Sequence, residues 1–200
     1  MKNKYPNPYP TFSGQPLPQR EYEIAELISL IKQKQCNSML EIGSRYGDSL
    51  YRITCECFTP KSKIRVIELP DGPWGNSKSL PLLQSCVTEL RAKKYNCSLF
   101  IGDSTKDNAI EYAKDNAPFD VVFIDGDHRY EGVKKDFYNY RDMASKMIVF
   151  HDIDKEGQLI NDDDSLGVGI LWNEIKCNYN YVEIVWSKQR GMGIGVILLQ

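Results

Sequence analysis

The sequence lacks the features that mark nucleic-acid-binding, membrane and secreted proteins. Its 200 residues carry a formal net charge of only -2, so no positive field favours nucleic acid or an anionic membrane surface. No apolar run approaches the ~20 residues that a membrane helix needs. The first residues also lack the apolar core of a signal peptide. These absences predict a cytoplasmic protein with neither a nucleic-acid nor a membrane partner.

Cysteine pairs and histidines are scarce as well. The six cysteines are scattered at positions 36, 55, 57, 86, 97 and 177, and none forms the Cys-x-x-Cys spacing typical of zinc sites. Without a signal peptide we expect reduced thiols and not a disulfide framework. The chain has only two histidines, His128 and His151. Any site that needs imidazole must therefore use one of these two positions.

Short apolar runs alternate with amphipathic stretches along most of the chain. This pattern predicts an α/β fold, in which a mainly parallel sheet has helices on both faces. The expected strands are Ser38–Ile42, Lys63–Leu69, Cys97–Ile101, Phe119–Ile124, Met147–Phe150, Tyr181–Trp186 and Ile194–Leu199. The expected helices are Glu21–Lys34, Asp48–Phe58, Leu83–Lys93, Ala109–Lys114, Val133–Met143 and Val168–Ile175.

The N-terminal end differs in composition from the rest. Residues 1–19 are rich in proline and aromatics, a density that no helix or sheet interior tolerates, so we expect an arm there. Such an arm either packs on its own surface, forms a homo-oligomer with a second subunit, or stays disordered. Residues 20–200 contain no internal repeat or linker, and we expect them to form one domain.

The stretch Met39-Leu-Glu-Ile-Gly-Ser-Arg-Tyr-Gly47 organises the predicted fold. An apolar strand ends in Glu41 and Ile42, and two glycines then enclose three residues before a helix begins. Gly43 allows a sharp turn and a close approach of the backbone to a ligand. Free N–H groups at the helix start and the charge of Glu41 would face the carboxyl end of the strand, where α/β sheets bind ligands.

Polar residues also follow the next two strands. Glu68 stands where nucleotide-binding folds place an acid for ribose hydroxyls, and Asp103 and Ser104 follow the third strand, within reach of an adenine amine. Each acid taken alone is equally consistent with a solvated turn. Ser104-x-x-Asp107 also matches a helix N-cap.

These residues, with Phe119-Asp-Val-Val-Phe-Ile-Asp-Gly-Asp-His128, resemble the class I S-adenosylmethionine (SAM)-dependent methyltransferases. The most similar branch is the small O-methyltransferase-like group with the run Phe-Ile-Asp-Gly-Asp-His, which shares motifs with catechol and caffeoyl-CoA O-methyltransferases and with cephalosporin hydroxylase-like proteins. The resemblance implies a Rossmann-like, seven-stranded, mostly parallel sheet with a reversed last strand. Arg45 stands where many methyltransferases have glycine.

The resemblance also implies roles for residues at this edge. SAM would be bound through its methionine part by Glu41, Gly43, Ser44 and Gly47, through its ribose by Glu68, through its adenine by Asp103 and Ser104, and beside its methyl group by Asp125. The acceptor would be a small molecule, methylated at a hydroxyl oxygen.

Removing the acceptor's proton requires a metal or a base. In related metal-dependent O-methyltransferases the ends of the fourth and fifth strands supply carboxylate ligands, and Asp125 and Asp152 match them. His151 would join them, and the ion would be Mg²⁺ or Mn²⁺. His128 matches the position of a general base. Alternatively, both histidines only cap loops and hydrogen-bond carboxylates.

Two other classes of function stay open. One is a metal-dependent hydrolase or hydroxylase-like enzyme on the same fold, and the other is a non-catalytic nucleotide-binding protein. Trp74 either covers the cofactor or is an exposed loop aromatic, and Arg190–Gly193 either borders the acceptor pocket or forms a hairpin turn. The run Asp162–Asp164 is more typical of a solvated loop than of a metal site, and Trp172 is more typical of a core residue than of a substrate platform.

Overall fold

A computed structural model of the chain describes residues 21–70, 72, 76–154, 167–185 and 192–199. The predicted N-terminal arm, Trp74, the Asp162–Asp164 run and Arg190 lie outside these residues. The division of the chain into an arm and one domain therefore stays a prediction.

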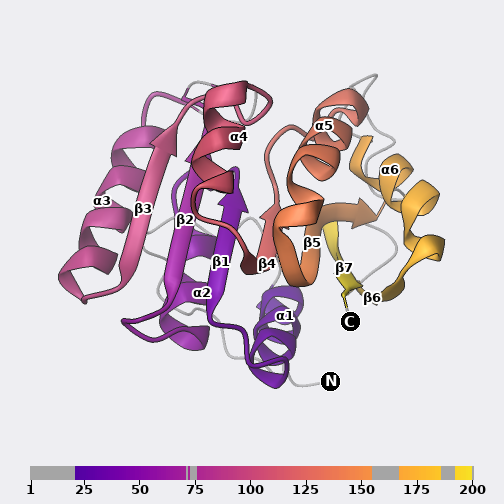
Figure 1. Cartoon of the computed structure of the whole chain (residues 1–200), viewed down its shortest axis with the longest axis horizontal. Helices are drawn as coiled ribbons and strands as arrows, with labels where there is room; N and C mark the ends of the chain where they lie inside the picture. Colours follow the sequence, from indigo (N-terminus) through magenta and orange to yellow (C-terminus); the bar gives the residue numbers. More distant parts are fainter. Residues whose placement is uncertain (1–20, 71, 73–75, 155–166, 186–191, 200) are drawn as a thin grey trace.

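Seven strands form one sheet in the order β3-β2-β1-β4-β5-β7-β6 (Figure 1). The first five are parallel to one another, whereas β7 is antiparallel to both β5 and β6. The last strand in the sequence is thus the reversed one, which confirms the predicted topology. The strands are β1 (Ser38–Ile42), β2 (Lys63–Glu68), β3 (Asn96–Ile101), β4 (Phe119–Ile124), β5 (Ala144–Asp154), β6 (Asn180–Ile184) and β7 (Met192–Leu198).

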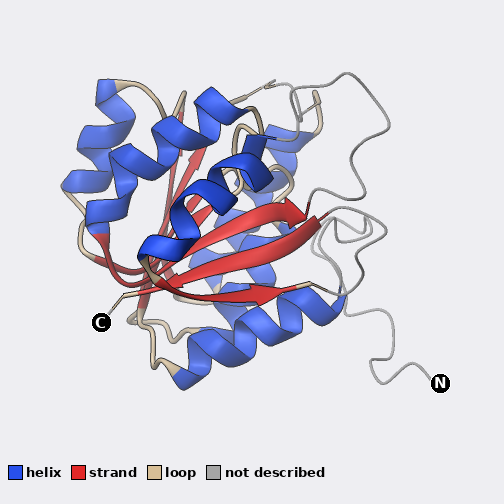
Figure 2. Cartoon of the chain, turned by 90° about the vertical axis from the view of Figure 1, so that its right-hand side faces the viewer, coloured by secondary structure: helices blue, strands red, loops and turns tan. Residues whose placement is uncertain are grey.

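Helices cover both faces of the sheet (Figure 2). One apolar core forms between the sheet and α1, α2 and α3, and a second forms between the opposite face and α4, α5 and α6. The helices are α1 (Glu21–Gln33), α2 (Asp48–Cys57), α3 (Ser79–Ala92), α4 (Asp107–Lys114), α5 (Tyr130–Tyr140) and α6 (Gly167–Ile175), with 3₁₀ turns at Arg141–Met143 and Lys176–Asn178.

Alternation along the central strands explains the two cores. In β4, Val121 and Phe123 join the first core, while Val122 and Ile124 join the second. Successive side chains of a strand point to opposite faces, so a strand covered on both sides must be apolar throughout. Trp172 is also a core residue as predicted, because it is 1% exposed and packs in the second core.

Most predicted boundaries differ from the structure by at most two residues, but three elements and one cap differ by more. Helix α3 begins at Ser79 and not at Leu83, since a proline in the first turn costs no hydrogen bond. Helix α5 begins at Tyr130 and ends at Tyr140. Strand β5 continues past Phe150 to Asp154, because β7 pairs with it as far as Asp154. The predicted N-cap at Ser104 is wrong: α4 has Lys106 at its N-cap, and the Ser104 hydroxyl bonds elsewhere.

All six cysteines are free, as expected. No helix among the described residues combines the length and the apolar composition that a membrane crossing requires.

Candidate active site

The carboxyl ends of the parallel strands bring the predicted site residues to one edge of the sheet. Gly43 adopts a φ of +80°, and a Cβ built there would lie only 2.2 Å from the backbone oxygen of Asp125. The turn after β1 therefore lies directly against the loop after β4, and only glycine fits there. Gly47 is the N-cap of α2 with a φ of 87°, as the sequence predicted for the helix start.

Glu68, at the end of β2, holds the turn that follows β1. Its Oε2 accepts hydrogen bonds from the backbone N–H groups of Ser44 at 2.6 Å and Arg45 at 3.0 Å. Burial raises the pKa of Glu68, and these two hydrogen bonds oppose that rise. The acid thus fixes a backbone turn in addition to any contact with a ligand.

Glu41 lies beneath the same turn and is fully buried. Its Oε1 accepts a hydrogen bond from Ser49 Oγ at 2.7 Å, and its Oε2 accepts one from Ser44 Oγ. Burial raises the pKa of Glu41 to about 8, although the two serine hydroxyls oppose this rise. The sequence suggested a negative charge at the mouth of the strand, but burial favours the neutral form of Glu41.

The loop after β3 is anchored by helix α5. The Ser104 hydroxyl donates to Asp136 Oδ1 at 2.6 Å, and the Tyr140 hydroxyl donates to the Ser104 carbonyl oxygen at 2.6 Å. Asp103 Oδ1 accepts hydrogen bonds from the backbone N–H and the hydroxyl of Thr105 at 2.9 and 2.8 Å. Asp103 and Ser104 therefore lie at the predicted edge, in a loop whose shape is fixed from below.

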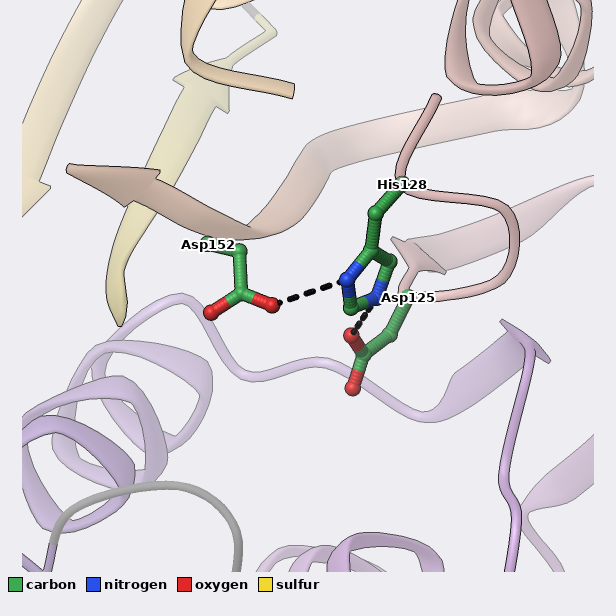
Figure 3. Close-up of side chains that lie close together, drawn as sticks. All are labelled: Asp125, His128 and Asp152. Carbon is green, nitrogen blue, oxygen red and sulfur yellow. Dashed lines mark ion pairs between the residues drawn. The ribbon is translucent and has the colours of Figure 1, made fainter. Parts of the chain in front are cut away.

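Asp125, His128 and Asp152 converge beside these loops (Figure 3). His128 Nε2 lies 3.4 Å from Asp125 Oδ1, and His128 Nδ1 lies 3.1 Å from Asp152 Oδ2. The imidazole thus stands between two carboxylates that come from the ends of neighbouring strands, since β4 pairs with β5.

His151 approaches the same carboxylates from within β5. Its Nδ1 lies 3.2 Å from Asp125 Oδ1 and 3.4 Å from Asp152 Oδ1. Burial lowers the pKa of both imidazoles, but the charges of Asp125 and Asp152 raise it overall, most strongly for His151. Conversely, burial raises the pKa of both carboxyls, and the imidazoles hold it below its usual range. The carboxylates therefore favour the charged form of each imidazole, and the imidazoles favour the charged form of each carboxylate.

Backbone strain marks this position. Asp152 has a φ of 65°, a left-handed conformation that non-glycine residues adopt at a cost of about 1–3 kcal/mol. The pairing of β5 with β7 is irregular between His151 and Asp154, and the carboxylate of Asp152 points toward His128 (Figure 3). The sequence predicted these residues after a strand that ends at Phe150, whereas both lie inside β5.

The donors present fit a divalent cation. Single donor atoms of Asp125, His128 and Asp152 all lie within 4.8 Å of one another. The His128 imidazole now stands between the two carboxylates with a different nitrogen toward each, so it would have to turn to offer one nitrogen to an ion held by both. His128 stands in this group where the sequence predicted His151. A bound ion would require its imidazole ligand to be neutral.

Residues 40–153 match a family model described as a methyltransferase domain. This match spans more than half of the chain. The chain belongs to the methyltransferase domain family. The predicted class of enzyme is thereby confirmed. No curated protein matches the sequence.

Solved structures with the same fold include several methyltransferases. An O-methyltransferase from Bacillus cereus in complex with SAH is 16% identical, with a TM-score of 0.68, over 92% of this chain and 84% of that one. TomG from Streptomyces achromogenes, an O-methyltransferase involved in tomaymycin synthesis and in complex with SAM, is 15% identical, with a TM-score of 0.69, over 94% and 85%. SAH-bound PaMTH1 from Podospora anserina is 14% identical, with a TM-score of 0.62, over 91% and 80%. At such identities these likenesses confirm the Rossmann-like methyltransferase fold.

Sequence reasoning missed two polar residues of this methyltransferase edge. Ser49 holds Glu41 from the first turn of α2, and Asp136 holds Ser104 from α5. Asp136 did leave a signal, because it is an acid on the helix face that also carries Val133, Phe137 and Tyr140. A single acid on an apolar helix face needs a buried partner.

Proposed function

We propose that this methyltransferase uses SAM to methylate a hydroxyl oxygen of a small-molecule acceptor. The observation that carries the proposal is the position of the Asp125–His128–Asp152 cluster, directly beside the glycine turn braced by Glu68. The glycine turn and Glu68 suit a nucleoside with a methionine tail. The Asp125–His128–Asp152 cluster suits an acceptor oxygen that must lose a proton. That similar proteins are O-methyltransferases with SAM or SAH bound supports the same reading.

The residues around Glu68 suit the nucleoside of SAM. Both hydrogen bonds from the turn use Oε2, so Oε1 is the oxygen that would accept from the ribose hydroxyls. Leu69 and Ile101 are each 45% exposed although both are apolar, and they flank Glu68. Exposed apolar side chains next to a carboxylate suit the faces of a purine ring above a ribose. Glu41, Gly43, Ser44 and Gly47 would surround the methionine part, while Asp103 and Ser104 would lie near the adenine.

The neighbouring cluster suits deprotonation of the acceptor. Asp125, Asp152 and one imidazole, from His128 or His151, would hold a divalent ion; Mg²⁺ or Mn²⁺ was expected, and the imidazoles favour the softer of these. Such an ion lowers the pKa of a bound hydroxyl. Because SAM already carries an activated methyl group, the protein mainly aligns donor and acceptor and excludes water.

His128 is our candidate for the general base. It is 17% exposed, whereas His151 is 4% exposed, so an acceptor can reach His128 more easily. His128→Ala should lower turnover, and the loss should shrink at high pH, where the acceptor ionises unaided. A loss of the same size at every pH would assign His128 to a different task.

The test is methyl transfer followed by mass spectrometry of a metabolite pool incubated with SAM. We expect a product one methyl group heavier, a need for a divalent ion, and loss of the product in Asp125→Asn and Asp152→Asn. Asp142→Asn is the matched control, because the Asp142 carboxylate is 87% exposed and lies in the 3₁₀ turn that follows α5. Full activity in excess chelator would rule out the metal. Binding of SAM without any methyl transfer would favour a hydrolase, a hydroxylase-like enzyme or a non-catalytic nucleotide-binding protein.

Three expectations stay predictions: a cytoplasmic location, the lack of a nucleic-acid or membrane partner, and a homo-oligomer formed through the N-terminal arm. Size-exclusion chromatography with and without residues 1–19 would test the last of these.

A further inference from the structure

Helix α5 places a carboxyl group between two loops of the proposed cofactor edge. Asp136 is 0% exposed. Its Oδ1 accepts the hydrogen bond from Ser104 in the loop after β3. Its Oδ2 is buried, has no hydrogen-bond partner among the described residues, and lies 3.3 Å from the position of a Cβ at Gly126, in the loop after β4. A buried carboxyl with one idle oxygen costs stability, which indicates a role beyond packing.

The charge of Asp136 decides whether its Oδ1 can only accept a hydrogen bond. Burial raises the pKa of Asp136 to about 7, the Ser104 hydroxyl opposes this rise, and the charges of Asp127 and Asp103 add to it. When the group is ionised, both oxygens can only accept. When it is neutral, its proton can lie on either oxygen, so Oδ1 is certain to accept from Ser104 only above this pKa, where the binding test is made.

The Ser104 hydroxyl therefore has its proton committed inward. Its carbonyl oxygen is held by Tyr140, so the residue cannot easily turn away. Ser104 is partly exposed, and the lone pairs of its Oγ are what it can offer to a ligand at the edge. An outward-facing acceptor suits a ligand group that donates a hydrogen bond.

We propose that Asp136 is a positioning residue that holds the Ser104 hydroxyl as an acceptor toward the nucleobase of the methyl donor, and thereby selects adenine over hypoxanthine. The proposal rests on the proposed function, in which Ser104 lies near the adenine. Adenine carries an amino group that donates, whereas hypoxanthine carries an oxygen that accepts at the same place.

Accepting hypoxanthine would require the Ser104 hydroxyl to reverse. It would then donate outward and leave Asp136 Oδ1 buried without the donor that it has in the structure. A buried acceptor that loses its partner is costly, so we expect the adenine ligand to bind roughly tenfold more tightly, or better. A purely structural role for Asp136 would instead affect both nucleobases alike.

The test is calorimetry with two ligands: S-adenosylhomocysteine and its deaminated analogue S-inosylhomocysteine. The measured quantity is the ratio of their two dissociation constants. Ser104→Ala and Asp136→Leu should both bring this ratio close to one, whereas Ser104→Thr, which keeps the hydroxyl, should preserve it. Tyr140→Phe is the matched control, because it removes the other anchor of Ser104 without changing the direction of the hydroxyl. It should weaken both ligands by the same factor.

The outcomes separate the inference from the function on which it rests. No binding of S-adenosylhomocysteine to the wild type would overturn the proposed function. Binding without a preference in the wild type, or an unchanged ratio in Ser104→Ala or in folded Asp136→Leu, would overturn the inference alone. Thermal unfolding checks that each variant folds. If Asp136→Leu does not fold, the smaller Asp136→Ala should show the same loss of preference, and an unchanged ratio there would equally contradict it.

Discussion

Replacing Glu41 by glutamine should change how the stability of this methyltransferase depends on pH. Glu41 is fully buried, and burial raises its pKa from the usual 4.5 to about 8. Between these two values the folded chain binds one more proton than the unfolded chain. Wild-type stability should therefore fall as the pH rises through this window, by about 1.4 kcal/mol per pH unit and on the order of 4–5 kcal/mol in all.

A glutamine at position 41 cannot bind or release a proton in this pH range, but it can keep both hydrogen bonds to the serines. Its amide oxygen accepts from one of the serines, Ser44 or Ser49, and its amide nitrogen donates to the other, because a hydroxyl can act in either direction. Glu41→Gln should thus be relatively more stable at the upper end of the window. A cationic ligand such as SAM should also drive the proton off Glu41, so SAM binding near pH 7 should release protons in the wild type.

The assay is urea unfolding of both proteins at one-unit steps from about pH 5 to about pH 8. The free-energy difference between them should grow steadily in favour of the variant. Glu111→Gln controls for the loss of one charge at an exposed position in α4. Parallel curves for wild type and Glu41→Gln would refute the reasoning, because they would mean that Glu41 is ionised in the folded chain.

Two substitutions test the packing around this edge. Gly43→Ala places a Cβ 2.2 Å from the Asp125 carbonyl oxygen at a φ of +80°, so urea unfolding should show a free energy of unfolding lower by about 3 kcal/mol or more. A smaller decrease would mean that the loop after β4 can move to make room for the methyl group. Arg52→Met removes two hydrogen bonds of 2.7 Å to Glu21, which join α2 to α1. Because Glu21 keeps 21% exposure, the free energy of unfolding should fall by about 2 kcal/mol, less than for a fully buried pair. An unchanged urea midpoint would mean that the pair does not stabilise the fold.

The sheet was predictable because its strands are locally encoded. Phe119–Ile124 is apolar except for Asp120, and the structure has β4 over the same residues, covered on both faces. The end of β5 was not predictable in the same way. His151 and Asp152 are polar, and only the pairing with β7, some forty residues further along the chain, keeps them in the strand.

The site was predictable only in part for the same reason. Asp125 and Asp152 could be placed together because they follow or end neighbouring strands, and the structure does bring them together. The sequence gives no local sign that His128 inserts between them or that Ser104 bonds Asp136, 32 residues away. Such contacts depend on how a loop and a helix pack against each other.

Calorimetric titration of the wild type and Glu68→Ala with SAM and S-adenosylhomocysteine tests the central claim most directly. Both ligands should bind the wild type with micromolar affinity, about −8 kcal/mol. Glu68→Ala should weaken both by roughly 1–3 kcal/mol, because the ribose loses a charged acceptor and the turn loses two hydrogen bonds. No heat for either ligand in the folded wild type would contradict a SAM-dependent methyltransferase, whereas unchanged affinity in Glu68→Ala would contradict only the role of Glu68.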